Sequence, residues 1–253
     1  MTADQKNNLV DKNSEYFEQL YSREEEPWEY SKKAVEVLRH EFVVKTACSL
    51  KPNYSRILDV GCGKGRLTFL FNGLAPEILG IDVSKTAVQQ AETYANKFSQ
   101  QGNSAKADNS RFHFSVTNIT NSSFPANYFD LILLCDGLEG WHLNMNEKEK
   151  VLAESFRLLM LGGFVILTDY LKHERFSAFE AIISNSPLKV VRSVYLNDRF
   201  AYQFNSWFKM GEKLKVVQWI FANKILAKGL MKISSLFGKR GSKHICVIAA
   251  KTN

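Results

Sequence analysis

Short apolar runs alternate with helical patterns along the chain. The apolar runs, typical of strands buried on both faces, occupy residues 56–60, 77–83, 112–116, 128–135, 164–169, 188–196 and 244–250. Apolar residues at helical spacing occupy residues 35–47, 67–74, 85–98 and 147–159. Strands separated by helices predict an α/β fold with a doubly wound, seven-stranded and mostly parallel sheet.

A glycine-rich turn follows the first apolar run. Residues 57–66 read ILDVGCGKGR, which sets Gly61, Gly63 and Gly65 directly after a strand and before a helix. Glycines let the backbone turn sharply and approach a ligand without a Cβ clash. In open α/β sheets, ligands bind at the carboxyl ends of the strands. The turn therefore predicts a ligand site.

Two carboxylates indicate which ligand this site takes. A dinucleotide site needs G-x-G-x-x-G with a pyrophosphate on the helix N-terminus, but here Arg66 stands at the third glycine position. Asp59 ends the first strand, where it would repel a pyrophosphate and attract the ammonium of S-adenosylmethionine. Asp82 ends the second strand and can accept hydrogen bonds from both ribose hydroxyls. We therefore predict S-adenosylmethionine as the cofactor.

These motifs resemble those of class I S-adenosylmethionine-dependent methyltransferases. Residues 59–65 match the family's first motif, and Asp82 matches its ribose-binding acid. Residues 157–163 (RLLMLGG) are similar to its L-x-P-G-G turn, with Leu161 in place of proline. The resemblance covers about residues 50–170 and implies the Rossmann-like methyltransferase fold.

The resemblance also assigns the adenine contacts. Residues 117–119 fall where the family has an acidic residue at the adenine amine, and Asn118 stands in its place. The Asn118 side-chain oxygen can still accept a hydrogen bond from that amine. The predicted cofactor-binding residues are Asp59, Gly61, Cys62, Gly63, Gly65, Asp82, Val83, Thr117, Asn118, Ile119 and Cys135.

The N-terminal segment resembles that of the nodulation-type N-methyltransferases. Those proteins carry an acidic D-P-W turn before the first helix and methylate an amine on a chitooligosaccharide. Here residues 26–30 read EPWEY, with Glu26 in place of the aspartate. The resemblance implies a lid that folds over cofactor and acceptor. In the alternative interpretation, Trp28 and Tyr30 only pack the following helix onto the sheet.

The residues after the fourth strand are expected near the transferred methyl group. Because the sulfonium is already an activated leaving group, methyl transfer needs alignment, desolvation and a deprotonated acceptor. We predict Asp136 or Glu139 to orient an amine acceptor, and His142, whose ordinary pKa suits a base, to serve a hydroxyl acceptor. Alternatively, Asp136 binds the methionine tail or caps a helix, and His142 is a surface residue. The expected substrate contacts are Trp28, Tyr30, Trp141 and Tyr170.

Positive charge is concentrated in one segment. The net charge is +7, yet residues 206–243 hold nine basic residues and one acid, so the remainder is close to neutral. Within residues 216–237, Lys224, Lys228 and Lys232 recur every four residues on one face of a predicted amphipathic helix. Such a helix can lie on an anionic membrane surface, cover the acceptor pocket or form a dimer contact. No RNA-binding signature accompanies it, which argues against nucleic acid as a partner.

The predicted organisation is one α/β domain with two additions. It comprises an N-terminal helical lid (1–50), the cofactor-binding domain (51–205), the basic amphipathic insertion (206–243) and the last strand (244–253). The chain has 253 residues, 45% of them hydrophobic, which suits one such domain. A polar N-terminus and the lack of a long apolar run predict a cytoplasmic protein, with any membrane contact peripheral. Four scattered cysteines predict neither a disulfide nor a metal site.

The predicted function is methyl transfer from S-adenosylmethionine to a nitrogen or oxygen of a small molecule, sugar or lipid-linked glycan. Two alternatives stay open, an RNA or protein methyltransferase and a cofactor-binding regulator without catalysis. The N-P-P-Y signature of base methylation is absent after the fourth strand, where residues 135–138 read CDGL. The glycine loop alone does not separate the enzyme from the regulator, because binding and catalysis are different properties.

Overall fold

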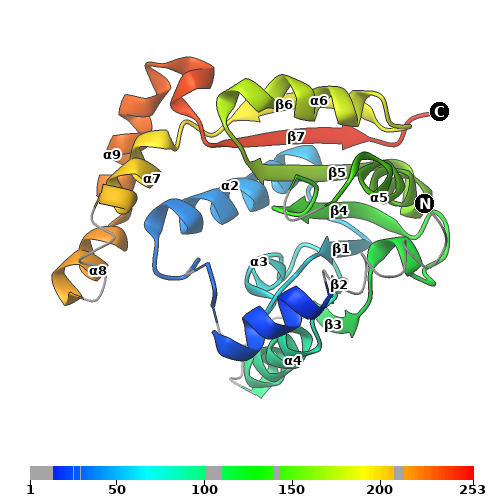
Figure 1. Cartoon of the computed structure of the whole chain (residues 1–253). Coiled ribbons are helices and arrows are strands. Elements are labelled where there is room, and N and C mark those ends of the chain that lie inside the picture. Colours follow the sequence, from blue (N-terminus) through cyan, green and yellow to red (C-terminus); the bar gives the residue numbers. More distant parts are fainter. Residues whose placement is uncertain (1–13, 25, 29, 101–109, 140–142, 208–213) are drawn as a thin grey trace.

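A seven-stranded sheet forms the centre of the molecule (Figure 1). The computed structural model describes residues 14–24, 26–28, 30–100, 110–139, 143–207 and 214–253. The strands are β1 (Arg56–Val60), β2 (Glu77–Asp82), β3 (Arg111–Val116), β4 (Phe129–Cys135), β5 (Leu159–Tyr170), β6 (Lys189–Tyr195) and β7 (His244–Ala250). Their order is β3-β2-β1-β4-β5-β7-β6; β1 to β5 pair in parallel, and β7 is antiparallel to both of its neighbours. The prediction of an α/β, mostly parallel sheet is confirmed.

Helices connect the strands, and some of them begin at polar capping residues. Besides a helix over residues 14–23, they are α2 (Ala34–Leu50), α3 (Arg66–Phe69), α4 (Lys85–Gln100), α5 (Met145–Leu158), α6 (Phe176–Ser184), α7 (Arg199–Trp207), α8 (Lys215–Phe221) and α9 (Lys224–Ser235). The hydroxyl of Ser84 accepts from the N–H of Ala87 and so caps α4. Asn144 and Glu147 form a reciprocal capping box at the start of α5.

Two hydrophobic clusters cover opposite faces of the sheet. Successive strand residues point to opposite faces, so Ile57 belongs to one cluster and Leu58 to the other. Helices α5 and α6 pack on the Leu58 face through residues such as Leu152 and Phe179. Helix α2 packs on the Ile57 face through Val43. Because helices bury both faces, a binding site has room at the ends of the strands.

Two segments before β6 differ from the predicted pattern. The helix predicted over residues 67–74 is only the short α3, followed by turns. The turn predicted over residues 157–163 is instead continuous with β5, which begins at Leu159. Gly162 takes a φ of +77°, a left-handed conformation that glycine adopts without a steric penalty. The register between β4 and β5 shifts between the pairs Phe129–Leu159 and Leu131–Phe164. The residues predicted as a turn therefore form an irregular stretch within β5.

The segment predicted as one amphipathic helix over residues 216–237 contains two helices. Asn223 separates them, because its side-chain oxygen accepts from the N–H groups of Ile225 and Leu226 and so begins α9. The helical insertion is predicted over residues 206–243, whereas the chain leaves the sheet at Tyr195, where β6 ends. Helices α7, α8 and α9 project together from one side of the molecule (Figure 1), and α9 packs against α7 and α2. None of the helices that the structure describes is long and apolar enough to cross a membrane.

Candidate functional site

A cavity of about 270 Å³ lies at the carboxyl ends of β1, β2 and β4. Ten of the predicted cofactor-binding residues line it: Asp59, Gly61, Cys62, Gly63, Asp82, Val83, Thr117, Asn118, Ile119 and Cys135. The predicted acceptor residues Trp28, Tyr30 and Asp136 line the same cavity. Residues distant in the sequence therefore meet at the strand ends, where open α/β sheets bind ligands.

The glycine turn has the backbone conformation that its composition predicts. Gly61 and Gly63 have φ values of +72° and +52°, which are unfavourable for residues with a side chain. A Cβ at Gly61 would meet no atom within 4 Å, so the backbone here borders open space. A Cβ at Gly63 would collide with the hydroxyl of Tyr21. Gly65 (φ +80°) does not line the cavity; a Cβ there would clash with Phe69, so its role in this structure is packing.

Asp82 connects the second strand to the glycine turn. Its Oδ2 accepts from the backbone N–H of Gly63 at 2.8 Å, and its Oδ1 accepts from the N–H of Ser84 at 2.9 Å. Burial raises the pKa of this carboxyl, although the backbone donors oppose the shift. Each carboxylate oxygen can accept more than one hydrogen bond. Asp82 therefore retains the capacity to accept from the two hydroxyls of a ribose.

Asp59 is a buried carboxyl at the end of β1. It accepts from the hydroxyl of Thr68 at 2.6 Å. Burial raises its pKa to about 7, and the nearby charge of Asp82 adds to that shift. A cation in the cavity would lower this pKa, because an opposite charge favours the ionised form. Two acids at adjacent strand ends beside an open glycine turn thus fit a cationic nucleoside such as S-adenosylmethionine.

Asn118 has a structural role in addition to its place in the cavity wall. Its side-chain oxygen accepts from the N–H and the hydroxyl of Thr120, both at 3.0 Å, and caps the short 3-10 helix Ile119–Asn121. The oxygen predicted to accept from the adenine amine therefore already has two donors. The Cys62 thiol is buried, and burial raises its pKa far above the ordinary value. This cysteine is a small lining residue, not a reactive thiolate.

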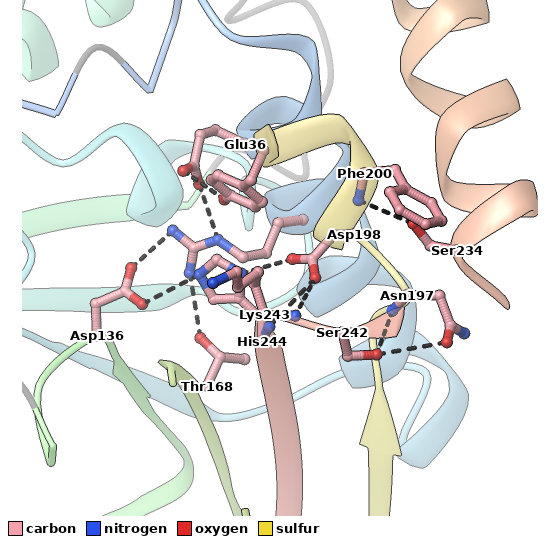
Figure 2. Close-up of polar contacts among 12 residues, drawn as sticks. Glu36, Asp136, Thr168, Asn197, Asp198, Phe200, Ser234, Ser242, Lys243 and His244 are labelled. Atoms are coloured by element: carbon pink, nitrogen blue, oxygen red, sulfur yellow. Dashed lines mark hydrogen bonds and ion pairs between the residues drawn. The ribbon is translucent and has the colours of Figure 1, made fainter. Parts of the chain in front are cut away.

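Asp136 follows β4 and is held by Arg39, a buried residue of α2. The residue has a φ of +59°, an uncommon conformation for a non-glycine residue. Its Oδ2 lies 2.7 Å from Arg39 Nη2 and accepts from the hydroxyl of Tyr30 at 3.3 Å. Arg39 is fully buried and also donates to Glu36 at 3.0 Å and to Thr168 at 3.3 Å (Figure 2). These contacts fix the position of the carboxylate at the cavity wall.

A buried imidazole approaches the other oxygen of Asp136. His244 Nε2 lies 3.8 Å from Asp136 Oδ1, which has no hydrogen-bond partner. The Nδ1 of His244 lies 2.6 Å from Asp198 Oδ2 (Figure 2). Burial alone would raise the pKa of Asp198, but the charge of His244 and its hydrogen bond lower it. Tyr202 of α7 completes the group by donating to Glu36 at 2.5 Å.

The N-terminal segment forms an aromatic wall over the cavity. Phe17, Tyr21, Trp28 and Tyr30 all line it, and the rings of Trp28 and Tyr30 stack with centroids 6.0 Å apart. Glu18 fastens this segment to the start of α4, because its carboxylate accepts from the hydroxyls of Ser84 and Thr86. The N-terminal segment therefore lies over the cavity, and its role as a lid stays a prediction.

His40 is a lining residue that the sequence interpretation did not single out. It lies on α2 with its ring 5.4 Å from that of Tyr30. Burial, together with the charge of Arg39, lowers its pKa to about 3. A neutral imidazole with so low a pKa is a weak proton acceptor. Tyr21, His244 and Asp198 were likewise not predicted as site residues, because no motif singles them out.

The remaining predicted site residues lie outside the cavity wall or outside the described residues. Glu139 is buried and paired with Lys148 at 2.6 Å and with Arg175. Tyr170 is half-exposed and packs against the rings of Tyr202 and His244. Trp141 and His142 lie outside the described residues, so their predicted roles stay predictions. Among the described residues, histidine, cysteine and acidic side chains form no group of three or more that could hold a metal.

Comparisons with known proteins identify a methyltransferase domain. Residues 52–222 match the family model described as a methyltransferase domain. The chain is 25% identical over 162 residues to the ubiquinone/menaquinone biosynthesis C-methyltransferase UbiE of Psychromonas ingrahamii, covering 62% of this chain and 60% of that protein. It is 28% identical over 122 residues to the phosphoethanolamine N-methyltransferase of Plasmodium falciparum, covering 48% and 41%. The chain thus spans about half the length of the curated relatives that it matches.

Solved structures share the fold. The N-methyltransferase NodS from Bradyrhizobium japonicum, in complex with S-adenosyl-L-homocysteine, has a TM-score of 0.58 and 20% identity, covering 70% of this chain and 89% of that one. The [4+2]-cyclase SpnF has a TM-score of 0.59 and 18% identity, covering 83% and 80%. At these identities the likeness concerns the fold alone. The comparisons confirm the resemblance of the motifs to class I methyltransferases. They also confirm the prediction that the cofactor is S-adenosylmethionine.

Proposed function

Because the chain belongs to the methyltransferase domain family, we propose that it transfers a methyl group from S-adenosylmethionine to an amine nitrogen of a small molecule. The observation that carries this proposal is the Asp136 carboxylate, which lines the cavity and is fixed there by Arg39 and Tyr30. An oriented carboxylate suits an acceptor that donates hydrogen bonds from nitrogen.

The cavity residues divide into those that hold the cofactor and those that face the acceptor. When bound, S-adenosylmethionine supplies a methyl carbon attached to a positively charged sulfur. Asp82 would hold its ribose hydroxyls, Asp59 its ammonium, and residues 117–119 its adenine. Asp136 and the aromatic wall would then orient the acceptor, so that catalysis depends on alignment and exclusion of water.

The charges behind Asp136 favour a positively charged product. The guanidinium of Arg39 pairs with two carboxylates, those of Glu36 and Asp136. A third carboxylate, that of Asp198, pairs with His244, whose other ring nitrogen faces Asp136. Methylation of a neutral amine leaves a cationic ammonium, which this negative environment stabilises. Trp28 and Tyr30 add ring faces that attract cations.

The imidazole that lines the described part of the cavity is not an effective base for a hydroxyl acceptor. This imidazole is that of His40, and its pKa of about 3 keeps it from accepting a proton at neutral pH. An amine in its neutral form carries a free electron pair and attacks without a base. This difference favours nitrogen over oxygen as the methylated atom.

A labelled transfer assay tests the proposal. The protein would be incubated with S-adenosylmethionine carrying a ¹³C methyl group and with primary amines paired with alcohols of the same carbon skeleton. We expect N-methyl signals by nuclear magnetic resonance with amines and none with their paired alcohols. The Asp136→Asn variant should lose this transfer, whereas Glu149→Gln, on the exposed face of α5, should keep it. Methylation confined to hydroxyls or to carbon would contradict the proposal.

A further inference from the structure

Helices α8 and α9 present large apolar side chains to solvent. On α9, Ala227 and Ser234 face the protein, and the opposite side carries Ile225, which is 84% exposed, and Leu236 just beyond the helix, which is 82% exposed. On α8, Trp219 is 69% exposed. Single exposed apolar residues are common on protein surfaces, but several on one pair of adjacent helices mark an interaction site.

Lysines surround these apolar side chains. Lys215, Lys228 and Lys232 are exposed on the two helices, and Lys232 lies on the same side of α9 as Ile225. The chain contains no acidic residue from position 213 to position 243. Lys224 differs from the other three, because it pairs with Glu41 of α2 at 2.6 Å. The hydrogen bond with Lys224 lowers the pKa of Glu41 and the charge of Lys228 also helps to lower it, so this one acid of α2 lies near both lysines. The surface therefore combines apolar side chains with an excess of positive charge.

We propose that this surface, the outer side of α8 and α9, docks on an anionic lipid bilayer. Trp219, Ile225 and Leu236 would enter the boundary between headgroups and acyl chains, as the apolar face of an interfacial helix does. Lys215, Lys228 and Lys232 would contact the anionic headgroups. The proposal concerns a surface beyond the cavity and does not depend on the chemistry of the acceptor.

The charges and the apolar residues weigh against two other occupants. A second copy related by two-fold symmetry would bring the same lysines of both chains together, with no acid on this segment to offset them. Nucleic acid would engage the lysines through phosphate contacts, but it would leave Ile225 and Leu236 without an apolar partner. A bilayer with anionic headgroups satisfies both features at once.

Co-sedimentation of the full chain with vesicles tests this surface. Vesicles of phosphatidylcholine alone would be compared with vesicles that also contain phosphatidylglycerol, at low and at high salt. We expect binding to the anionic vesicles at low salt and a clear decrease at high salt, because salt screens the lysines. Lys228→Glu with Lys232→Glu should reduce partitioning by about tenfold or more, and Trp219→Ser with Ile225→Ser should reduce it similarly.

Matched variants on another surface complete the experiment. The variant with Lys150→Glu and Lys189→Glu makes the same change of net charge at exposed positions of α5 and β6. The variant with Leu161→Ser and Val191→Ser removes exposed apolar side chains from β5 and β6. These controls should bind vesicles like the unchanged chain. Failure of the unchanged chain to bind anionic vesicles at low salt, or an equal loss in the controls, would overturn the proposal. So would a dimer in sedimentation analysis that the Trp219→Ser, Ile225→Ser variant disrupts.

Discussion

The imidazole of His244 is bound to the carboxylate of Asp198, with Nδ1 of the ring 2.6 Å from Oδ2. Both side chains are buried, and they come from the start of β7 and from the loop between β6 and α7. A carboxylate bound to one ring nitrogen fixes the orientation of the imidazole, and so of its second nitrogen. Here that second nitrogen, Nε2, lies 3.8 Å from Asp136 Oδ1. Asp136 is therefore positioned by Arg39 on one oxygen and approached by His244 on the other.

Replacement of the cavity carboxylate should slow methyl transfer without releasing the cofactor. We expect Asp136→Asn to lower kcat by about 100-fold, because an acceptor that is misplaced by a small distance loses most of its alignment. The dissociation constant for S-adenosylhomocysteine, measured by calorimetry, should stay within about threefold, since the ribose and ammonium contacts remain. An unchanged kcat would show that Asp136 does not act on the acceptor.

Loss of the buried imidazole should alter catalysis through Asp136. We expect His244→Gln and Asp198→Asn each to lower kcat by roughly tenfold. This effect is smaller than that of Asp136→Asn, because His244 and Asp198 act only by positioning the Asp136 carboxylate. The KM for S-adenosylmethionine should stay unchanged in His244→Gln, whereas a general loss of structure would raise it as well. His173→Gln, on an exposed 3-10 helix, is the matched histidine control. An unchanged kcat in His244→Gln would contradict the positioning role.

The strands and the cofactor acids could be predicted because their signals are local. Arg56–Val60 and His244–Ala250 are mostly apolar, and Asp59 and Asp82 lie at or next to the ends of their strands. The topology of a parallel sheet then brings both acids to one edge.

The acceptor side could not be predicted to the same extent, because its contacts join segments far apart in the sequence. No spacing rule connects Arg39 with Asp136, or Tyr21 with Gly63, since each pair depends on how α2 and the N-terminal segment pack on the finished sheet. The break at Asn223 carried a local signal, a capping residue within a helical pattern. Glu139 was placed near the acceptor from its position after β4, but the structure pairs it with Lys148 instead.

Cofactor affinity should depend on pH through Asp59. Burial raises the pKa of this carboxyl to about 7, so it is protonated in much of the free protein below that pH. Binding of a cationic ligand requires the ionised form, and affinity should fall by up to about tenfold for each pH unit below 7. Calorimetric titrations between pH 5 and pH 8 would measure this, and Asp59→Asn should flatten the dependence. Affinity that does not vary over this range in the unchanged chain would contradict the role of Asp59.

Asp169 should make the fold less stable at alkaline pH. Burial raises its pKa from the ordinary 3.8 to about 8, with the charge of Asp136 adding to the shift. The folded state therefore holds a proton that the unfolded state releases, so the free energy of unfolding falls as pH rises from about 4 to 8. Asparagine keeps an oxygen for the N–H groups of Leu138 and Glu139. We expect Asp169→Asn to raise Tm at pH 8 and to change it little at pH 5; an equal effect at both values would contradict this.

The central claim is that two strand-end acids and the glycine turn bind S-adenosylmethionine, and calorimetry with S-adenosylhomocysteine tests it most directly. We predict binding by the unchanged chain and no measurable uptake of a nicotinamide dinucleotide. Asp82→Ala should weaken binding by about 1.5–3 kcal/mol, or roughly 10- to 150-fold, because it removes charge-assisted hydrogen bonds. Tight binding of the dinucleotide, or an unchanged dissociation constant in Asp82→Ala, would contradict the claim.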